Sequence, residues 1–339
     1  MFHVRMLDRN AIIAVGELGT VIKTIDGGAD WVQQSSPTTA VLSSVYFVNK
    51  NIGWIGGSDG VVLHTTDGGE SWEPHPVAPN IWAVYSYTFI NADTGWMGGM
   101  SNGANILKTT DGGVTWAAMD TIRRASGDDN SIYSIDFATP QQGWISAVDG
   151  TIWATIDGGE SWTLQTEPTT DVLLSIDFYD STTGWAVGRN GALLNTVDGG
   201  TNWISQLKGD AVGLNSVCFV DQNVGWAVGA HGTILHTNNG GENWERQNSH
   251  TDKGLGSIFI DSNNGIWLVG GKRKKNAVIL NSIDNGEHWN INNIDVTDIL
   301  CSIYFTTNGF GWAVGADGVV LKTMDNGINW ILNNTGLTG

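Results

Sequence analysis

One short stretch that pairs a carboxylate with two glycines recurs along the chain. Its first copy, "TIDGGADW" at residues 24–31, places Asp26 beside Gly27 and Gly28 and ends on a tryptophan. Such a turn could hold a metal ion, cradle a phosphate or supply a catalytic carboxylate. We call this stretch the box. Its copies carry, at the Asp26 position, Asp26, Asp67, Asp111, Asp157, Asp198, Asn239, Asp284 and Asp325.

The regular spacing of the box favours a structural turn over a catalytic or metal-binding loop. Successive copies lie 41, 44, 46, 41, 41, 45 and 41 residues apart, a period typical of repeat architectures. An Asp can accept backbone N–H groups within its own turn, and glycine permits the positive φ that the turn needs. Asn239 keeps the acceptor oxygen, while Asn285 and Asn326 replace the first glycine with the residue that best tolerates that φ. We predict that the eight box residues are structural.

Each repeat reads as four short strands and no helix. The fifth repeat contains "LLSIDF", "GWAVG", "GALLNT" and "NWISQ", each bounded by turn residues. No segment has the apolar period of a helix. Of the 17 tryptophans, eight close the boxes and seven lie in the GW-type second strands, which predicts a core role for both series.

The period and the four strands in each repeat predict an all-β solenoid, propeller or array. Of these we expect a single β-propeller of four-stranded antiparallel blades with a box turn in each repeat. Eight repeats predict eight blades, with seven blades as the alternative. The first repeat begins at its innermost strand, so we expect closure of blade against blade without a shared sheet. One domain is expected over residues 1–339, with repeats at approximately 1–34, 35–75, 76–119, 120–165, 166–206, 207–247, 248–292 and 293–339.

Composition narrows the classes of partner. A net charge of −18 disfavours nonspecific binding to nucleic acid or to anionic membranes. The sequence shows no signal peptide and no long apolar run. Cys218 and Cys301 fall in different repeats and are expected to be free, because a disulfide needs Cα atoms within about 7 Å. We expect no cofactor, no metal site and no catalytic residue.

Two other sets of polar residues repeat in register. Asp136 and Asp177 share an inner-strand position that Arg5 holds in the first repeat. A cation site in the channel is one interpretation, but a solvated polar lining is favoured. His64 and His236 share a third-strand position that other repeats fill with lysine, which predicts an exposed strand site; these lysines are Lys23, Lys108 and Lys322.

Function is expected where the repeats deviate, because loops carry function on a rigid scaffold. The longest insertion, "AAMDTIRRASGDDNSIYS", joins the fourth strand of repeat three to the first strand of repeat four. Two more, "GGKRKKNAV" in repeat seven and "GGMSNGAN" in repeat three, join second to third strands. In an up-and-down blade these connections share one face, opposite the boxes. The candidate partner-binding residues on that face are Arg123, Arg124, Arg189, Lys272, Arg273, Lys274 and Lys275.

The pattern T/S-x-D-x-G-x-x-W resembles the Asp-box, or BNR, motif. Combined with "GWAVGxxGxxLxTxDGGxxW", it is similar to the propeller family of the photosystem II stability and assembly factor over essentially the whole chain. The resemblance implies a non-enzymatic scaffold that binds a protein partner, which could belong to a larger complex. It also implies a location outside the cytoplasm: periplasmic, lumenal or secreted.

An Asp-box glycan-binding protein or a sialidase-like glycoside hydrolase is the alternative. Sialidases also carry Asp-boxes, but they need three arginines around the substrate carboxylate, a Tyr–Glu pair and an acid Asp. The seven arginines of this chain suggest no such triad, and no RIP-like segment precedes the first box. Xyloglucan-type glycosidases place their carboxylates across two propellers, whereas this chain supplies one. A protein-binding propeller is therefore the favoured interpretation.

Overall fold

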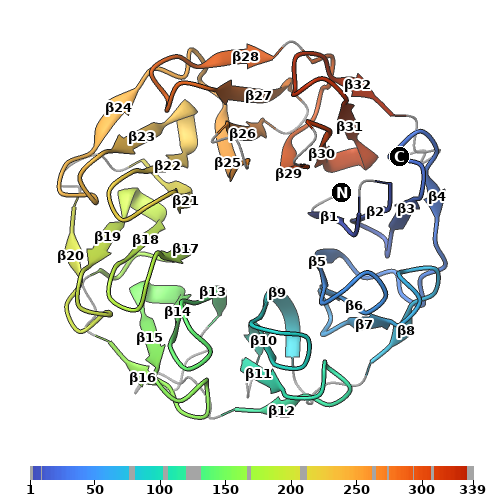
Figure 1. The fold of residues 1–339 in the computed structure, drawn as a ribbon, viewed down its shortest axis with the longest axis horizontal. Helices are drawn as coiled ribbons and strands as arrows, with labels where there is room; N and C mark the ends of the chain where they lie inside the picture. The colour runs from blue at the N-terminus through green and yellow to red at the C-terminus, as the bar shows by residue number, and fades with distance from the viewer. Residues whose placement is uncertain are drawn as a thin grey trace.

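A computed structural model describes residues 3–8, 10–75, 81–101, 106–119, 131–165, 169–206, 212–261, 265–272, 275–292, 294–306 and 309–333. Eight four-stranded sheets stand around a central axis like the blades of a propeller (Figure 1). The predicted all-β, eight-bladed fold is thus confirmed, and the seven-bladed alternative is wrong. The extent of the domain over the full 1–339 stays a prediction.

The first four blades follow the chain in order. Their strands are, for blade 1, β1 (His3–Met6), β2 (Ile12–Val15), β3 (Val21–Thr24) and β4 (Val32–Gln33); for blade 2, β5 (Leu42–Phe47), β6 (Gly53–Gly57), β7 (Val62–Thr65) and β8 (Glu73–Pro74); for blade 3, β9 (Ile81–Phe89), β10 (Gly95–Ser101), β11 (Ile106–Thr109) and β12 (Ala117–Ala118); and for blade 4, β13 (Ile132–Phe137), β14 (Gly143–Ala147), β15 (Ile152–Thr155) and β16 (Thr163–Leu164).

The remaining four blades complete the ring. Their strands are, for blade 5, β17 (Leu173–Phe178), β18 (Gly184–Gly188), β19 (Leu193–Thr196) and β20 (Ile204–Ser205); for blade 6, β21 (Leu214–Phe219), β22 (Gly225–Gly229), β23 (Ile234–Thr237) and β24 (Glu245–Gln247); for blade 7, β25 (Gly254–Ile260), β26 (Ile266–Gly271), β27 (Ala277–Ser282) and β28 (Asn290–Asn292); and for blade 8, β29 (Leu300–Phe305), β30 (Gly311–Gly315), β31 (Val320–Thr323) and β32 (Ile331–Leu332).

Within each blade the four strands pair in chain order, antiparallel, from the centre of the ring outward (Figure 1). A bulge interrupts the first pair in blades 2 to 8, for example between Leu42 and Ser44. Three-residue 3₁₀ turns join the second and third strands of blades 4, 5, 6 and 8: η1 (Val148–Gly150), η2 (Arg189–Gly191), η3 (Ala230–Gly232) and η4 (Ala316–Gly318). No helix among the described residues is long and apolar enough to cross a membrane.

The ring closes where blade 8 meets blade 1. Trp312 and Val314 of blade 8 pack in one buried cluster with Val4, Ile12 and Trp31 of blade 1. The two sheets stay separate, as expected, since each contains only strands from its own end of the chain. Closure therefore rests on side-chain packing between blades.

The tryptophans of the second strands fill the contacts between blades. All seven are among the fully buried side chains: Trp54, Trp96, Trp144, Trp185, Trp226, Trp267 and Trp312. Trp185 shows their environment. Its ring stacks on Phe219 of blade 6 with centroids 3.3 Å apart, and its Nε1 donates to the Gly240 carbonyl at 3.1 Å. The predicted core role of this series is confirmed.

Candidate functional site

The box carboxylates are engaged inside their own turns. In blade 4, Asp157 Oδ1 accepts from Thr155 Oγ1 at 2.8 Å and from the Ser161 N–H at 3.0 Å, and Ser161 Oγ donates to Oδ2 at 2.6 Å. The hydrogen bonds from Ser161 and Thr155 lower the pKa of Asp157 to about 2. A carboxylate that is ionised and already bonded is poorly suited to proton transfer near neutral pH.

The blade 6 box keeps this arrangement with an amide in place of the carboxylate. Asn239 Oδ1 accepts from Thr237 Oγ1 at 2.9 Å and from the Asn243 N–H at 3.1 Å. The box thus needs an acceptor oxygen at this position and works without a charge there. That requirement supports the structural prediction for all eight box residues.

The inner-strand aspartates join neighbouring blades. Asp136 Oδ2 accepts from the Phe178 N–H at 2.7 Å, and Asp177 Oδ2 accepts from the Phe219 N–H at 3.0 Å. Burial, followed by the negative charge of Asp136, raises the pKa of Asp177 to about 7. Both side chains are half-buried. Instead of the freely solvated lining favoured from the sequence, this pair holds β13 to β17 and β17 to β21.

The lysines of the third-strand series are buried, so the prediction of an exposed strand site is wrong. Lys23, Lys108 and Lys322 are 7%, 9% and 9% exposed. Lys23 Nζ lies 2.5 Å from Glu70 Oε1, and Lys108 Nζ lies 2.5 Å from Glu160 Oε1, in each case in the box of the next blade. The reason is geometric: both faces of a propeller blade pack against other blades, so polar residues of a strand can be enclosed.

The two faces of the ring carry different connections. The second-to-third turns lie beside the segments that enter the first strands: the Arg189 N–H donates to the Val172 carbonyl and the Gly60 N–H donates to the Trp82 carbonyl. We call this the loop face. The boxes lie beside the first-to-second turns on the opposite box face, where the Gly158 N–H donates to the Gln141 carbonyl.

Three of the predicted partner-binding residues are described, and all three are on the loop face. Arg189 and Lys275 are exposed, and no described carboxylate pairs with either of them. Lys272 Nζ lies 3.3 Å from Asp252 Oδ2, and both side chains remain open to solvent. The other four predicted residues, Arg123, Arg124, Arg273 and Lys274, lie outside the described residues.

Sequence reasoning missed two residues of blade 6 that fill the gap between Arg189 and Lys272. His231, at the tip of η3, and Arg246, in β24, line a pocket of about 330 Å³ with Ser249 and Thr251. One guanidinium nitrogen of Arg246 donates to Thr233 Oγ1 at 3.1 Å, which orients the group. Arg246 could have been placed on the loop face from the sequence, because it follows the box tryptophan by two residues on a strand that ends at that face.

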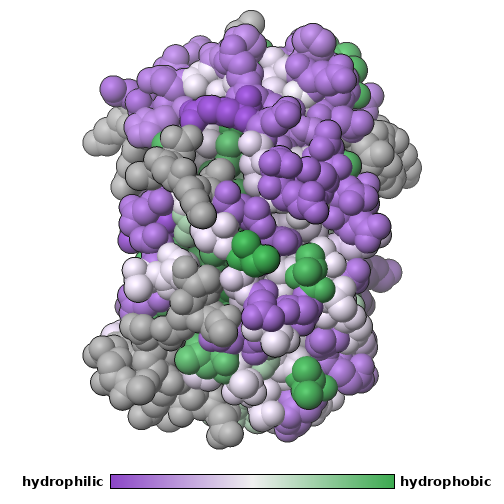
Figure 2. All heavy atoms as spheres, turned by 90° about the vertical axis from the view of Figure 1, so that its left-hand side faces the viewer, coloured by the Kyte–Doolittle hydropathy of each residue, from purple (hydrophilic) through white to green (hydrophobic). Residues whose placement is uncertain are grey.

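The loop face is divided by charge. We call Arg189, His231, Arg246, Lys272 and Lys275 the basic sector; it runs over blades 5, 6 and 7. The corresponding turns of blades 2, 4 and 8 carry acidic residues instead, namely Asp59, Asp149 and Asp317. Figure 2 shows the outer edge of the ring from the side of β20 and β24: hydrophilic side chains prevail in its upper part, and separate apolar side chains lie in its middle and lower parts.

The described arginines do not gather at one point. Arg5 lies on β1 of blade 1, with its guanidinium 5.1 Å from the centre of the Tyr46 ring. Arg189 belongs to blade 5, across the ring in Figure 1, and Arg246 belongs to blade 6. These three arginines cannot form the carboxylate-binding triad that a sialidase requires.

Comparison with known proteins identifies sequence relatives of this chain. A family model described as photosynthesis system II assembly factor YCF48 matches residues 1–82, 76–167 and 161–254. The chloroplastic photosystem II stability/assembly factor HCF136 of Cyanidioschyzon merolae is 40% identical over 70 residues, which is 20% of this chain and 15% of the relative. HCF136 of Oryza sativa subsp. japonica is 30% identical over 110 residues, 31% of this chain and 26% of the relative. Each match spans less than a third of the relative's length.

Solved structures share the fold. A structure described as YCF48 bound to D1 peptide superimposes with a TM-score of 0.60 and 22% identity, covering 79% of this chain and 87% of its own. YCF48 from Cyanidioschyzon merolae gives 0.60 and 21%, covering 79% and 91%. An ancestral GH74 enzyme gives 0.65 and 14%, covering 98% and 47%. At these identities the likeness concerns the fold alone.

Family membership rests on the sequence matches together with the repeated architecture. The three matched segments run without a gap from residue 1 to residue 254, more than half of the 339-residue chain. The chain therefore belongs to the family described as photosynthesis system II assembly factor YCF48.

Proposed function

We propose that this chain is an assembly-factor-like scaffold that binds an acidic segment of a protein partner through the basic sector, without catalysis. The observation that carries the proposal is the placement of Arg189 and Lys275, exposed and unpaired among the described residues, in a chain of net charge −18. Exposed cations that no described carboxylate neutralises are available to a partner.

The basic sector suits an extended acidic peptide. Arg246 is held by Thr233 and keeps further guanidinium donors for a carboxylate, which arginine can bind in a bidentate manner. The pocket of about 330 Å³ beside it has room for one side chain. Exposed ion pairs contribute only about 0–1 kcal/mol each, so their main effect is on encounter and orientation.

The relatives suggest what class of partner to test first. A solved YCF48 was bound to D1 peptide, and the curated relatives are named as chloroplastic photosystem II factors. We propose that this chain also recognises a peptide segment of a larger complex and acts outside the cytoplasm, in a periplasmic, lumenal or secreted setting. The glycosidase alternative gains no support, since the described box carboxylates are engaged and the described arginines lie apart.

Site-specific crosslinking tests the assignment of the face. A photoreactive amino acid is placed at Arg189 or at Lys275, and, as the matched control, at Lys50, an exposed lysine on the box face. With D1 peptide as the probe, we expect adducts from positions 189 and 275 and none from position 50. Adducts that form equally well from position 50 would show that the loop face is not the binding surface.

A further inference from the structure

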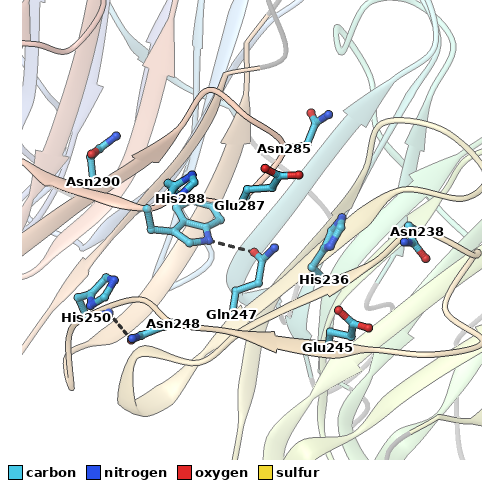
Figure 3. A pocket seen from close by; sticks show the side chains of 12 residues that line it. His236, Asn238, Glu245, Gln247, Asn248, His250, Asn285, Glu287, His288 and Asn290 are labelled. Carbon is cyan, nitrogen blue, oxygen red and sulfur yellow. Dashed lines mark hydrogen bonds between the residues drawn. The ribbon is translucent and has the colours of Figure 1, made fainter.

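Two further pockets of the ring differ in how their polar groups are used. The larger, of about 740 Å³, lies between blades 6 and 7 (Figure 3), and there Gln247 Oε1 already accepts from Trp289 Nε1 at 2.9 Å. The smaller, of about 280 Å³, lies on β1, β5 and β9, the innermost strands of blades 1 to 3 (Figure 1). In the smaller pocket, two enclosed hydroxyl groups lack such a partner among the described residues.

The lining of the smaller pocket is polar and carries no charge. It consists of three serines, three tyrosines, His3 and Val45, so none of its described residues is an Asp, Glu, Lys or Arg. Burial, followed by the positive charge of Arg5, lowers the pKa of His3 to about 4. Burial also raises the pKa values of the three tyrosines above their ordinary range. The imidazole and the phenols are therefore neutral at pH 7.

The two enclosed hydroxyl groups belong to neighbouring blades. Ser44 of blade 2 is 8% exposed, and neither its Oγ nor the Oη of Tyr87 in blade 3 has a hydrogen-bond partner among the described residues. His3 contributes a donor beside them: its Nδ1 accepts from the Val45 N–H at 3.0 Å, which leaves the proton on Nε2. Because an enclosed hydroxyl without a partner is costly, a ligand that bonds these groups would relieve the penalty.

The pocket forms where blades 1 and 3 depart from the repeat. Tyr87 stands where the other seven blades have valine or isoleucine, as Val45 in blade 2 and Ile135 in blade 4. His3 holds the position that is serine in the other seven blades, as Ser44 in blade 2. A hydroxyl that enters an aliphatic core position lowers stability unless it is bonded. The fold alone therefore gives no reason for the hydroxyl of Tyr87.

Tyr85 gives the pocket an aromatic wall. Its ring stacks on Tyr133 of blade 4, with centroids 5.8 Å apart and planes at 1°, and Tyr85 remains 38% exposed. The same position is Ser43 in blade 2 and Leu174 in blade 5, so this ring also departs from the repeat. An exposed aromatic ring with a phenol offers a ligand both an apolar surface and a polar group.

We propose that this pocket binds one neutral sugar ring, whose hydroxyl groups bond to Ser44 and Tyr87 and whose C–H face packs on Tyr85. Sugar hydroxyls both donate and accept, as serine and tyrosine hydroxyls do. A charged ligand would find no opposite charge among the described lining residues, and an apolar ligand would leave both enclosed hydroxyls unbonded. The site lies on blades 1 to 3, apart from the basic sector of blades 5 to 7, and its binding requires no catalysis.

Conservative variants remove one group of the site at a time. Tyr87→Phe and Ser44→Ala each delete a single hydroxyl, and Tyr85→Leu introduces the residue that blade 5 has at this position. The matched controls are both in blade 5. Tyr179→Phe deletes the phenol of a residue that is 49% exposed, and Ser175→Ala changes the position that corresponds to Ser44.

Saturation-transfer NMR titrations test the proposal, with the methyl glycosides of glucose, galactose, mannose and xylose as probes. We expect saturation transfer to the ring protons of at least one glycoside. Its affinity should fall about three- to tenfold in Tyr87→Phe, Ser44→Ala and Tyr85→Leu, while the two control variants bind like the unmodified protein. Absence of transfer to all four glycosides, or equal affinity in the site and control variants, would overturn the proposal.

A second measurement separates ligand binding from a structural role of Tyr87. Because no described group bonds to its hydroxyl, Tyr87→Phe should leave the free energy of unfolding unchanged or raise it when no sugar is present. If urea denaturation instead shows a clear loss of stability in Tyr87→Phe, the hydroxyl is bonded within the fold and is not held for a ligand.

Discussion

The box face and the loop face of the ring use their polar groups in opposite ways. On the box face, the carboxylate of Asp157 and the amide of Asn239 accept the same kinds of hydrogen bond within the same turn. On the loop face, the equivalent turns carry Asp59 in one blade, Arg189 in another and Lys272 in a third, and the cations stay exposed. The polar groups that recur form hydrogen bonds within the fold, whereas the cations that vary between blades stay exposed to solvent.

The turns of both faces need residues in the left-handed region of φ. In the boxes of blades 7 and 8, the left-handed position is held by Asn285 at φ 57° and Asn326 at φ 56°, the substitution that such a φ tolerates best. On the loop face, the same region of φ is adopted by Leu18 at 54° and His231 at 55°. The equivalent turns of blades 2, 4, 5 and 8 hold Asp59, Asp149, Asn190 and Asp317 at this φ, so Leu18 is the exception among residue types that tolerate it.

The largest expected loss of stability comes from disrupting the side-chain packing between blades, which supports both faces. Trp185→Ala removes a fully buried ring, its stack on Phe219 and its bond to the Gly240 carbonyl. Urea denaturation should show a loss of about 3–5 kcal/mol in the free energy of unfolding. Trp82, 45% exposed, is the control, and its alanine variant should lose about 0.5 kcal/mol or less. Equal losses in the two variants would contradict this assignment of the core.

The contribution of the inner-strand residue Asp177 to stability should depend on pH. Because burial and Asp136 raise the pKa of Asp177 to about 7, the folded protein favours its protonated form. The contribution of this raised pKa to the free energy of unfolding is fully present below a pH of about 4 and is lost as the pH rises through 7. Asp177→Asn keeps an acceptor for the Phe219 N–H and removes the charge, so it should stabilise the protein at pH 8 by at most about 4 kcal/mol.

Equilibrium denaturation between pH 4 and pH 8 checks this prediction. The curves of Asp177→Asn and the unmodified protein should converge at pH 4 and separate as the pH increases. Parallel curves would mean that Asp177 titrates as an ordinary exposed carboxyl group.

Loss of a box carboxylate should lower the free energy of unfolding by a smaller amount, and only because its hydrogen bonds are lost. Asp157→Ala removes the acceptors of Thr155 and Ser161 and should cost about 1–3 kcal/mol in the free energy of unfolding. Asp157→Asn should cost less, because Asn239 performs this role in blade 6. Partner binding should survive in both variants. If folded Asp157→Ala protein has native stability but no longer binds, the box is a functional site and the contrast between the faces fails.

The fold could be predicted from the sequence because its signal is repeated in every blade. "LLSIDF" and "GWAVG" of the fifth repeat are β17 and β18 with the expected bounds. The exposure of Lys23 and Lys108 could not be predicted in the same way. An alternating strand pattern does not say whether a polar position meets water or the box of the next blade, and in this ring it meets Glu70 or Glu160.

The candidate site was predictable only where the repeats change length or charge. Lys272 and Lys275 follow from an insertion, and Arg189 from a charged turn. Neither an insertion nor a charged turn points to His231 and Arg246. They line one pocket because β24 ends beside η3 on the loop face. The bonds of Asp136 and Asp177 to Phe178 and Phe219 likewise depend on the offset between neighbouring blades, which one repeat cannot reveal.

The most direct test of the central claim, that the loop face receives an acidic partner, is the association rate with D1 peptide at low and physiological ionic strength. The variant Arg189→Glu, Lys272→Glu, Lys275→Glu should associate about tenfold more slowly at low salt, and the difference should shrink as salt screens the charges. Lys275→Glu alone should slow association more than Lys50→Glu, the single reversal on the box face, while the free energies of unfolding agree within about 0.5 kcal/mol. An unchanged rate in the triple variant, or an equal loss in Lys50→Glu, would contradict the account.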